Sequence, residues 1–300
     1  MNILITGGTG LIGTRLSQLL LQEGHQVAHL SRSEGQNSAI KTFVWDITKG
    51  QIDDQALLWA DALVHLAGAG IADSRWTEAR KQEIINSRTQ SLDLIYRRLS
   101  QIPHHIKVLV SSSAIGYYGG DTGQQQMSES SAVGQDFMAK VCVAWEAATQ
   151  PIEALGIRTV ILRTGIVLSN LGGALPKLAM PIKLGAGSPL GSGQQWQSWI
   201  HLDDMARLFQ KAITDTNMQG IYNGTAPQPV TNETLTYQTA KALNRPLFLP
   251  NVPVFALKLL LGEMAIVVVG GCYVKNERVA QTDFEYRYDD LAEALAIELA

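Results

Sequence analysis

The chain contains little cysteine. Its 300 residues include only two, Cys142 and Cys272, which lie far apart in the sequence and do not show the clustered spacing of a metal site. We therefore expect no bound metal. Because free thiols are kept reduced in the cytoplasm, that compartment is the one that we predict.

Charge is also scarce, and the chain has no basic block. Charged residues make up 17% of the chain, and 24 Lys and Arg against 27 Asp and Glu give a net charge of −3. Nucleic-acid binding usually requires a positive patch. We therefore expect no nucleic-acid partner.

Long uninterrupted apolar runs are lacking too. The most apolar stretch, residues 252–269, contains a lysine, a glutamate, a proline and a glycine, whereas a membrane-spanning helix needs about 20 largely apolar residues. We predict a buried helix over residues 254–261, a Gly-Glu turn and a second apolar segment, with no membrane span. A strand that starts at residue 2 would leave no room for a signal peptide.

The chain does have a glycine-rich turn near its start. An apolar run, Ile3–Ile5, leads into Gly7, Gly10 and Gly13, and apolar residues then recur at helical spacing. Gly7 allows a turn that a Cβ obstructs, Gly10 lets a pyrophosphate approach the backbone, and Gly13 lets the helix pack close to the strand. The helix N-terminus presents free N–H groups to phosphates. We predict a strand, turn and helix that bind a dinucleotide; an ordinary glycine-rich turn is the alternative.

The rest of the first half alternates short apolar runs with helical patterns, in a chain of which 46% is hydrophobic. Strands are predicted at residues 26–30, 42–44, 62–66, 107–111 and 158–162, and helices at 55–59, 77–99 and 137–155. This alternation predicts a Rossmann-type α/β fold with a doubly wound parallel sheet, which binds ligands at the carboxyl ends of its strands.

The pattern changes beyond residue 163. Glycine and proline are frequent from 164 to 195, which predicts a loop over the active site. Helices are expected from about residue 202, after an N-capping Thr231, and after Asp289. We predict a cofactor domain of residues 1–163 and a smaller C-terminal substrate lobe of residues 164–300, some of whose segments return to the first domain.

The glycine spacing resembles that of a known family. Gly-x-x-Gly-x-x-Gly with Thr6 in front resembles the nucleotide loop of short-chain dehydrogenases/reductases, and Thr-Gly-Gly-Thr-Gly-Leu-Ile-Gly resembles that of their extended branch, the NAD-dependent epimerase/dehydratase family. Segments 72–77, 191–204 and 253–286 further resemble an atypical, epimerase-like subgroup sometimes labelled cell division inhibitors. The resemblance implies a nucleotide cofactor and an oxidoreductase or isomerase reaction.

NADP(H) is the cofactor that the second predicted strand favours. NAD-selective proteins usually end this strand with Asp or Glu, but here it ends Ser31-Arg32, and no acid occurs before Glu34. Arg32 could pair with a 2′-phosphate, and Ser31 could add a hydrogen bond; a solvated surface arginine is the alternative. The family resemblance implies that Asp46 and Ile47 contact the adenine. The predicted cofactor-binding residues are Thr6, Gly7, Gly10, Leu11, Ile12, Gly13, Ser31, Arg32, Asp46, Ile47, Leu66, Ala67 and Gly68.

A serine at the end of the fifth major predicted strand is the first catalytic candidate. The stretch Ser-Ala-x-x-Tyr-Gly, which begins at Ser113, resembles the family's active-site serine region. Its hydroxyl would hydrogen-bond the substrate oxygen whose charge changes during hydride transfer. Three serines occur in a row at residues 111–113, and an N-capping or loop serine is the alternative.

The family's Tyr-x-x-x-Lys pair, in which the lysine helps the tyrosine act as a base, is absent from the next long helix. Lys140 is preceded at that spacing by Asp136. Alignment on Glu146 instead places Met138 and Cys142 at the tyrosine and lysine positions. Neither side chain can do that work, and packing in the core is the better interpretation of both.

Other groups could replace the missing pair. Tyr117 and Tyr118 follow Ser113 directly and are predicted catalytic candidates. Arg163 could hold an anionic substrate such as a phosphorylated sugar, with packing against the loop as the alternative. His201 could titrate near neutral pH, but it precedes a helix start, where a structural hydrogen bond is equally expected. The predicted substrate-binding residues are Glu129, Cys142, Arg163 and His201.

Two functions follow from these residues. The first is an NADP(H)-dependent oxidoreductase or nucleotide-sugar epimerase-like enzyme with a non-standard acid/base group and a small-molecule substrate, such as a phosphorylated or nucleotide sugar. The alternative is a non-catalytic NADP(H)-binding regulator that acts through a protein partner. We also keep a homodimer as a hypothesis.

Overall fold

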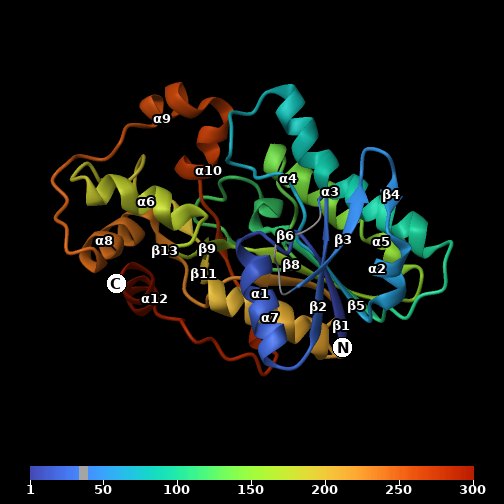
Figure 1. Cartoon of the computed structure of the whole chain (residues 1–300). Helices are drawn as coiled ribbons and strands as arrows, with labels where there is room; N and C mark the ends of the chain where they lie inside the picture. Colours follow the sequence, from blue (N-terminus) through green and yellow to red (C-terminus); the bar gives the residue numbers. More distant parts are fainter. Residues whose placement is uncertain (34–39) are drawn as a thin grey trace.

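The computed structural model describes residues 1–33 and 40–300 and confirms the predicted α/β fold class (Figure 1). Its main sheet has eight strands in the order β12-β8-β6-β5-β1-β2-β3-β4, and all of them pair in parallel except β4. The strands are β1 (Asn2–Thr6), β2 (Gln26–Ser31), β3 (Lys41–Asp46), β4 (Gln51–Ile52), β5 (Ala62–His65), β6 (Val108–Ala114), β8 (Arg158–Thr164) and β12 (Gly220–Gly224).

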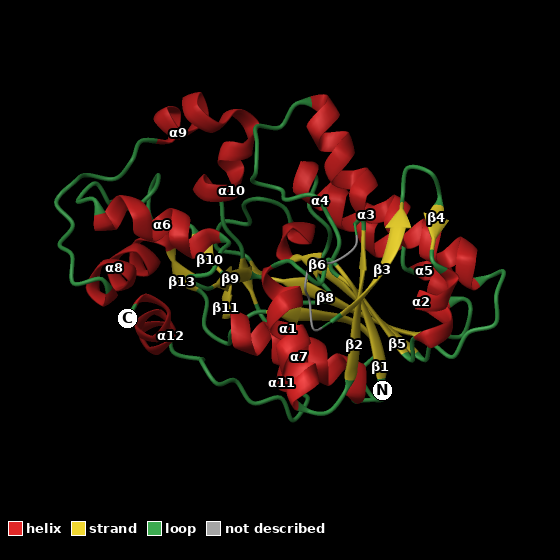
Figure 2. Cartoon of the chain, viewed as in Figure 1, coloured by secondary structure: helices red, strands yellow, loops and turns green. Residues whose placement is uncertain are grey.

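Helices cover both faces of this sheet (Figure 2). They are α1 (Leu11–Gln22), α7 (Leu202–Thr214) and α11 (Glu277–Ala280) on one face, and α2 (Asp54–Trp59), α3 (Glu78–Leu99), α4 (Phe137–Ala147) and α5 (Gln150–Glu153) on the other. Alternate residues of β1 enter the two cores, since Ile3 and Ile5 pack with α1 and α7 while Leu4 packs with α2 and α3. This period of two follows from the geometry of a strand.

A smaller group of elements lies beyond the carboxyl ends of β6 and β8. Its strands are β7 (Gln126–Met127), β9 (Ile166–Leu168), β10 (Trp196–Gln197), β11 (Trp199–His201), β13 (Val230–Thr231) and β14 (Tyr273–Val274). Its helices are η1 (Ile115–Tyr118), α6 (Ala174–Lys183), α8 (Asn232–Ala242), α9 (Val254–Leu261), η2 (Gly262–Ala265), α10 (Ile266–Val269) and α12 (Leu291–Leu299). The third apolar core joins α6, α8, α12 and β9. The second half of the chain thus also supplies β12 and α7 to the main sheet and its cover, while the 163/164 boundary itself stays a prediction.

The structure corrects two expectations about helices and loops. Residues 164–195 are not all loop, because they contain β9 and the ten-residue helix α6. The glycines lie before and after α6, and Pro176 falls in its first turn, where a missing N–H costs no hydrogen bond. The pattern over 137–155 is not one helix, because it is divided into α4 and α5 around Thr149.

The expectation that α9 is buried is also wrong. The helix spans the predicted residues, but only Leu257 is buried, and Phe255, Leu259 and Leu260 are 74%, 80% and 66% exposed. Apolar composition favours burial only where another element covers the helix, and α9 lies on the outside, at the top of Figure 1. None of the helices in the described part of the chain is long and apolar enough to cross a bilayer.

A neutral histidine lies at the end of β5. His65 is fully buried; its Nε2 lies 2.7 Å from Ser91 Oγ, and its Nδ1 accepts a hydrogen bond of 3.3 Å from Trp145 Nε1. If Nδ1 were protonated, two N–H donors would face each other, and the hydrogen bond from Trp145 would be lost. Burial, together with the charge of Arg88, lowers the pKa of His65 to about 3.

We therefore predict that acidification destabilises the fold through His65. Because its folded pKa is below the unfolded value of about 6.5, the unfolded chain takes up the proton first, and stability is lost as the pH falls from 6.5 toward 3. Between pH 7.5 and 5.5 this one group removes about 1.4 kcal/mol of unfolding free energy. Urea denaturation at both pH values should show a smaller pH difference for His65→Gln than for His105→Gln, which changes an exposed histidine. Equal pH differences would contradict the assignment.

Candidate functional site

The glycine-rich turn between β1 and α1 forms a cradle that side chains would fill. Gly7 has φ +68°, and a Cβ there would lie 2.8 Å from the carbonyl carbon of Leu66. A Cβ at Gly13 would lie 2.5 Å from Gly7 O, so α1 packs against the turn only because residue 13 is glycine. Gly10 is exposed, and among the described residues only Gly7 O, at 3.2 Å, lies near its would-be Cβ. The backbone at the N-terminus of α1 is therefore open to a ligand.

Two neighbours hold this turn in place. The Thr6 hydroxyl accepts hydrogen bonds of 3.2 Å from the N–H groups of Leu66 and Ala67, which ties β1 to the segment after β5. The His29 ring packs beneath Gly8, where a Cβ would lie 2.2 Å from it. The sequence analysis missed the reason for glycine at residue 8, and only the tertiary contact with His29 reveals it.

The predicted cofactor residues lie together at the carboxyl ends of β5, β1, β2 and β3, because these four strands are neighbours and parallel. These strand ends, with the glycine-rich turn, form the glycine-rich edge. Ser31 ends β2, and the Arg32 side chain that follows it is exposed. Asp46 ends β3 and accepts hydrogen bonds from the Thr48 hydroxyl and from the backbone N–H groups of residues 48 and 49. These bonds hold the pKa of Asp46 below its usual range. Glu34 lies outside the described residues.

An arginine that the sequence analysis missed packs against the segment that follows β5. Arg88 of α3 is only 9% exposed, and its Cζ would lie 2.9 Å from a Cβ at Gly68. Its guanidinium lies 4.7 Å from the ring centre of Trp145, and its Nε has no hydrogen-bond partner among the described residues. Burial lowers its pKa. A charged residue at helical spacing from the apolar Ile84 and Ile95 is the only signal that the sequence offered.

A buried ion pair lies beside the predicted active-site serine. Arg163, at 1% exposure, donates hydrogen bonds from Nε and Nη2 to the two carboxylate oxygens of Glu146, at 2.8 and 2.9 Å. Ser113 donates its hydroxyl proton to the same carboxylate at 2.7 Å. Burial opposes the charge on Arg163, but its hydrogen bonds and attraction to Glu146 outweigh burial and raise its pKa. The guanidinium is thus engaged by the chain's own carboxylate.

The two neighbouring tyrosines differ in their surroundings. Tyr118 is buried, and its hydroxyl donates to Asn223 Oδ1 at 2.7 Å and accepts from Arg163 at 3.0 Å. Burial raises its pKa. Tyr117 is only partly buried, and its ring lies 3.3 Å from the Arg163 guanidinium carbon. Of the two phenols, Tyr117 is the one with access to a ligand.

Glu129 joins the same cluster from a loop. Its Oε1 accepts hydrogen bonds from the backbone N–H groups of Asn223 and Arg278, at 3.1 and 3.3 Å, and its carbonyl oxygen accepts from Arg163. The structure thus brings together Glu129 and Arg163, together with the serine and tyrosines described above.

Met138 and Cys142 pack where the family's pair would stand. A Cβ at Gly116 would lie 3.2 Å from Met138 Cβ and 3.7 Å from Cys142 Sγ. Cys142 is buried and donates weakly to Ala114 O at 3.5 Å. Burial, with repulsion from Glu146, raises the pKa of Cys142 to about 11. This thiol is therefore protonated at neutral pH.

His201 is not part of the serine cluster. It caps α7 by accepting a hydrogen bond from the Asp203 N–H to Nδ1, at 3.1 Å, and its Nε2 lies 3.0 Å from Glu298. Its ring packs against Tyr288, with 3.9 Å between ring centres. Burial lowers its pKa, although Glu298 opposes this. Asp203 pairs with Arg15 at 2.6 Å.

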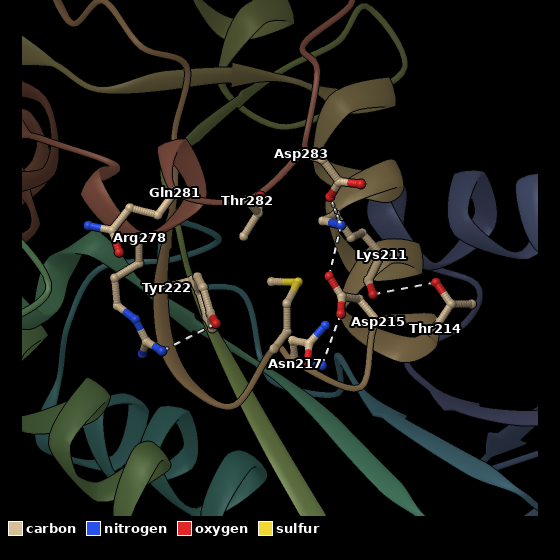
Figure 3. Close-up of a pocket in the computed structure, with 10 residues that line it drawn as sticks. Lys211, Thr214, Asp215, Asn217, Tyr222, Arg278, Gln281, Thr282 and Asp283 are labelled. Carbon is tan, nitrogen blue, oxygen red and sulfur yellow. Dashed lines mark hydrogen bonds and ion pairs between the residues drawn. The ribbon is translucent and has the colours of Figure 1, made fainter.

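Two cavities could hold a small molecule. One of about 620 Å³ lies at the amino end of β12, opposite the glycine-rich edge, and Figure 3 shows its polar lining. Three of its charges already pair with one another, since Lys211 bonds Asp215 and Asp283, and Arg278 donates to carbonyl oxygens. The other, of about 690 Å³, lies between α6, α10 and the segment after β5.

Comparison with known proteins adds a family. A family model described as "NAD dependent epimerase/dehydratase family" matches residues 3–223, and one described as a domain of unknown function (DUF1731) matches residues 252–297. The epimerase family protein YfhF of Bacillus subtilis is 36% identical over 297 residues, which cover 99% of this chain and 97% of the relative.

Two solved structures share the fold. A crystal structure of the human epimerase family protein SDR39U1 (isoform 2) with NADPH has a TM-score of 0.89 and 31% identity, and the match covers 100% of this chain and 99% of that one. A UDP-glucose 4-epimerase from Thermotoga maritima with UDP-glucose has a TM-score of 0.81 but 17% identity, over 100% and 97% of the two chains. The second likeness concerns the fold alone.

We predict that the Arg163–Glu146 pair supports folding strongly. Glu146→Ala leaves Arg163 buried without its carboxylate, which costs about 3–5 kcal/mol. Urea denaturation followed by circular dichroism measures this loss. Glu153→Ala is the matched control, since it removes an exposed glutamate from the neighbouring helix. The double variant Glu146→Leu/Arg163→Met should recover part of the loss. Equal losses for Glu146→Ala and Glu153→Ala would refute the prediction.

Proposed function

Since the chain belongs to the NAD dependent epimerase/dehydratase family, we propose that it is an NADP(H)-dependent oxidoreductase of the epimerase-like type, with an acid/base group other than the usual tyrosine–lysine pair. The observation that carries the proposal is the cradle at the β1–α1 turn. Side chains at Gly7 or Gly13 would collide with backbone, and the exposed N-terminus of α1 suits a pyrophosphate. The NADPH in the human relative's crystal structure supports this cofactor.

Different residues of the chain bind different parts of the cofactor. Gly10 lets the phosphates approach the backbone, and Arg32 with Ser31 holds the 2′-phosphate at the end of β2. The segment 66–68, which follows β5, lies close to the cofactor. The chemistry that bound NADP(H) supplies is the exchange of a hydride with a substrate carbon.

Tyr117 is the residue that we propose as proton donor to the substrate oxygen. It is partly exposed, whereas the Tyr118 hydroxyl is used by Asn223 and Arg163 and the Ser113 proton is used by Glu146. In this arrangement Ser113 is buried and fixes the ion pair behind Tyr117.

A non-catalytic regulator is the second candidate. The exposed apolar side chains of α9 favour it, because a large exposed apolar patch is typical of a protein–protein contact. A cytoplasmic location, a homodimer and sugar substrates remain predictions.

The cofactor preference can be tested by titration calorimetry. We expect wild-type protein to bind NADPH more tightly than NADH. Arg32→Ala should weaken NADPH by about 1.5–3 kcal/mol, as expected for a hydrogen bond to a charged group, and leave NADH nearly unchanged. Gly10→Asp, which puts a negative charge at the phosphate position, should abolish the binding of both. Equal wild-type affinities for the two cofactors would overturn the NADP(H) proposal.

Turnover separates the enzyme from the regulator. A screen of aldehydes, ketones, quinones and sugar nucleotides should reveal a compound that oxidises NADPH, followed by absorbance at 340 nm. On that compound Tyr117→Phe should lower kcat by roughly 10², with NADPH affinity unchanged, while Tyr96→Phe on α3 serves as the control. Tight NADPH binding without turnover, together with a partner captured only in the presence of NADPH, would favour the regulator.

A further inference from the structure

We propose that the cavity between α6 and α10 is the substrate site and that its ligand is an uncharged, largely apolar carbonyl compound rather than a nucleotide sugar. The proposal rests on the NADP(H)-dependent reaction proposed above and specifies its substrate class. The volume of about 690 Å³ lies in the range of small-molecule sites.

The cavity lies next to the glycine-rich edge, where the cofactor is proposed to bind, on two sides. Gly173 lines it, and a Cβ on Gly173 would lie 3.5 Å from the side chain of Leu11, the first residue of α1. Ile71 and Ala72 also line it, and they follow the segment after β5 that packs against Gly7. A ligand in the cavity is therefore next to the turn that would hold the cofactor.

The walls are mainly aliphatic and come from several elements. Side chains of β9, α6, α8 and α10 contribute, among them Ile166, Leu168, Leu178, Leu235, Val267 and Val268. Such a surface gains free energy by burying apolar ligand area, at about 25 cal/mol per Å². It offers few groups to hydroxyl-rich sugars.

Three uncharged polar residues of the lining each make a hydrogen bond within the protein. Gln197 Nε2 points to Gly270 O at 3.5 Å, Asn232 Oδ1 accepts from the Leu190 N–H at 2.8 Å, and Ser188 Oγ donates to Pro250 O at 2.8 Å. Each contact stabilises the cavity wall. The three side-chain atoms that make these bonds are therefore used within the protein and not by a ligand.

The charges of the lining do not suit a diphosphate. Lys177 is its only cation, and its Nζ lies 3.3 Å from the Ala72 carbonyl oxygen. Asp73 also lines the cavity, so one negative charge accompanies the single positive one. A nucleotide sugar carries two phosphate charges, which proteins usually hold with arginine or several N–H donors. No arginine of the described residues lines this cavity.

The reaction on such a ligand balances simply. The carbonyl carbon gains a hydride taken from NADPH, the π-electron pair of the C=O bond moves to oxygen, and the oxygen takes a proton from Tyr117, the donor proposed above, which is not itself part of the cavity lining. The products are an alcohol and NADP⁺, and solvent returns the proton to the phenolate.

The test uses the neutral apolar dye N-phenyl-1-naphthylamine, whose fluorescence rises in apolar sites, with the full chain in the presence and absence of NADPH. We expect decan-2-one to displace the dye and UDP-glucose to leave it bound. Displacement by UDP-glucose and not by decan-2-one would overturn the proposal. Failure of NADPH to bind, with dye binding intact, would instead reject the proposed function and leave the cavity assignment standing.

Substitutions inside and outside the cavity test whether the dye binds in it. Leu178→Asp puts a carboxylate into the cavity and should weaken dye binding at least tenfold. Met180→Asp, on the same helix but outside the lining, and Leu259→Asp on exposed α9 should change it less than twofold. NADPH affinity should stay constant in all three. If Leu178→Asp does not fold by circular dichroism, Ala174→Trp, which fills the cavity, decides in its place. Wild-type dye affinity in the folded cavity variant would overturn the proposal.

Discussion

The buried pair of Arg163 and Glu146 connects the parts of the molecule that must be fixed together. Arg163 lies near the carboxyl end of β8, and Glu146 belongs to α4. Through Ser113, Tyr118 and the Glu129 carbonyl, the pair also fixes the end of β6, the turn after it and the loop that leads to the smaller lobe. A buried charge without its partner is costly, so the geometry of all these segments depends on one contact.

The same pair also makes the candidate site polar. Met138 and Cys142 lie so close to Gly116 that a larger residue there would displace the helix. Positive charge near the site comes from Arg163 on β8 and from Arg88 on α3. These charges thus come from one strand of the sheet and from one helix that covers it.

Much of the fold could be predicted, because local patterns determine it. The glycine spacing predicted β1, the turn and α1, and apolar alternation predicted the positions of β2, β3, β5, β6 and β8 along the chain, whereas the sheet strand β12 was missed. Features that depend on distant contacts were missed: the exposure of α9, the helix α6 among glycines and prolines, and the reason for Gly8. The prediction grouped Ser113, Arg163 and the two tyrosines as candidates, but Glu146 served only to align the sequence. Its role appears only once β8 and α4 are packed together.

The residues after 251 are attached to the rest by specific contacts along much of their length. Glu263 pairs with Lys81 at 2.6 Å, Arg75 donates to the carbonyls at the end of α9, and Ser198 bridges the backbone of Cys272 and Val274. This segment closes the cavity with Val267 and Val268 but contributes nothing to the glycine-rich turn. Loss of the residues after 251 would therefore open the cavity and also uncover the first apolar core at Val279.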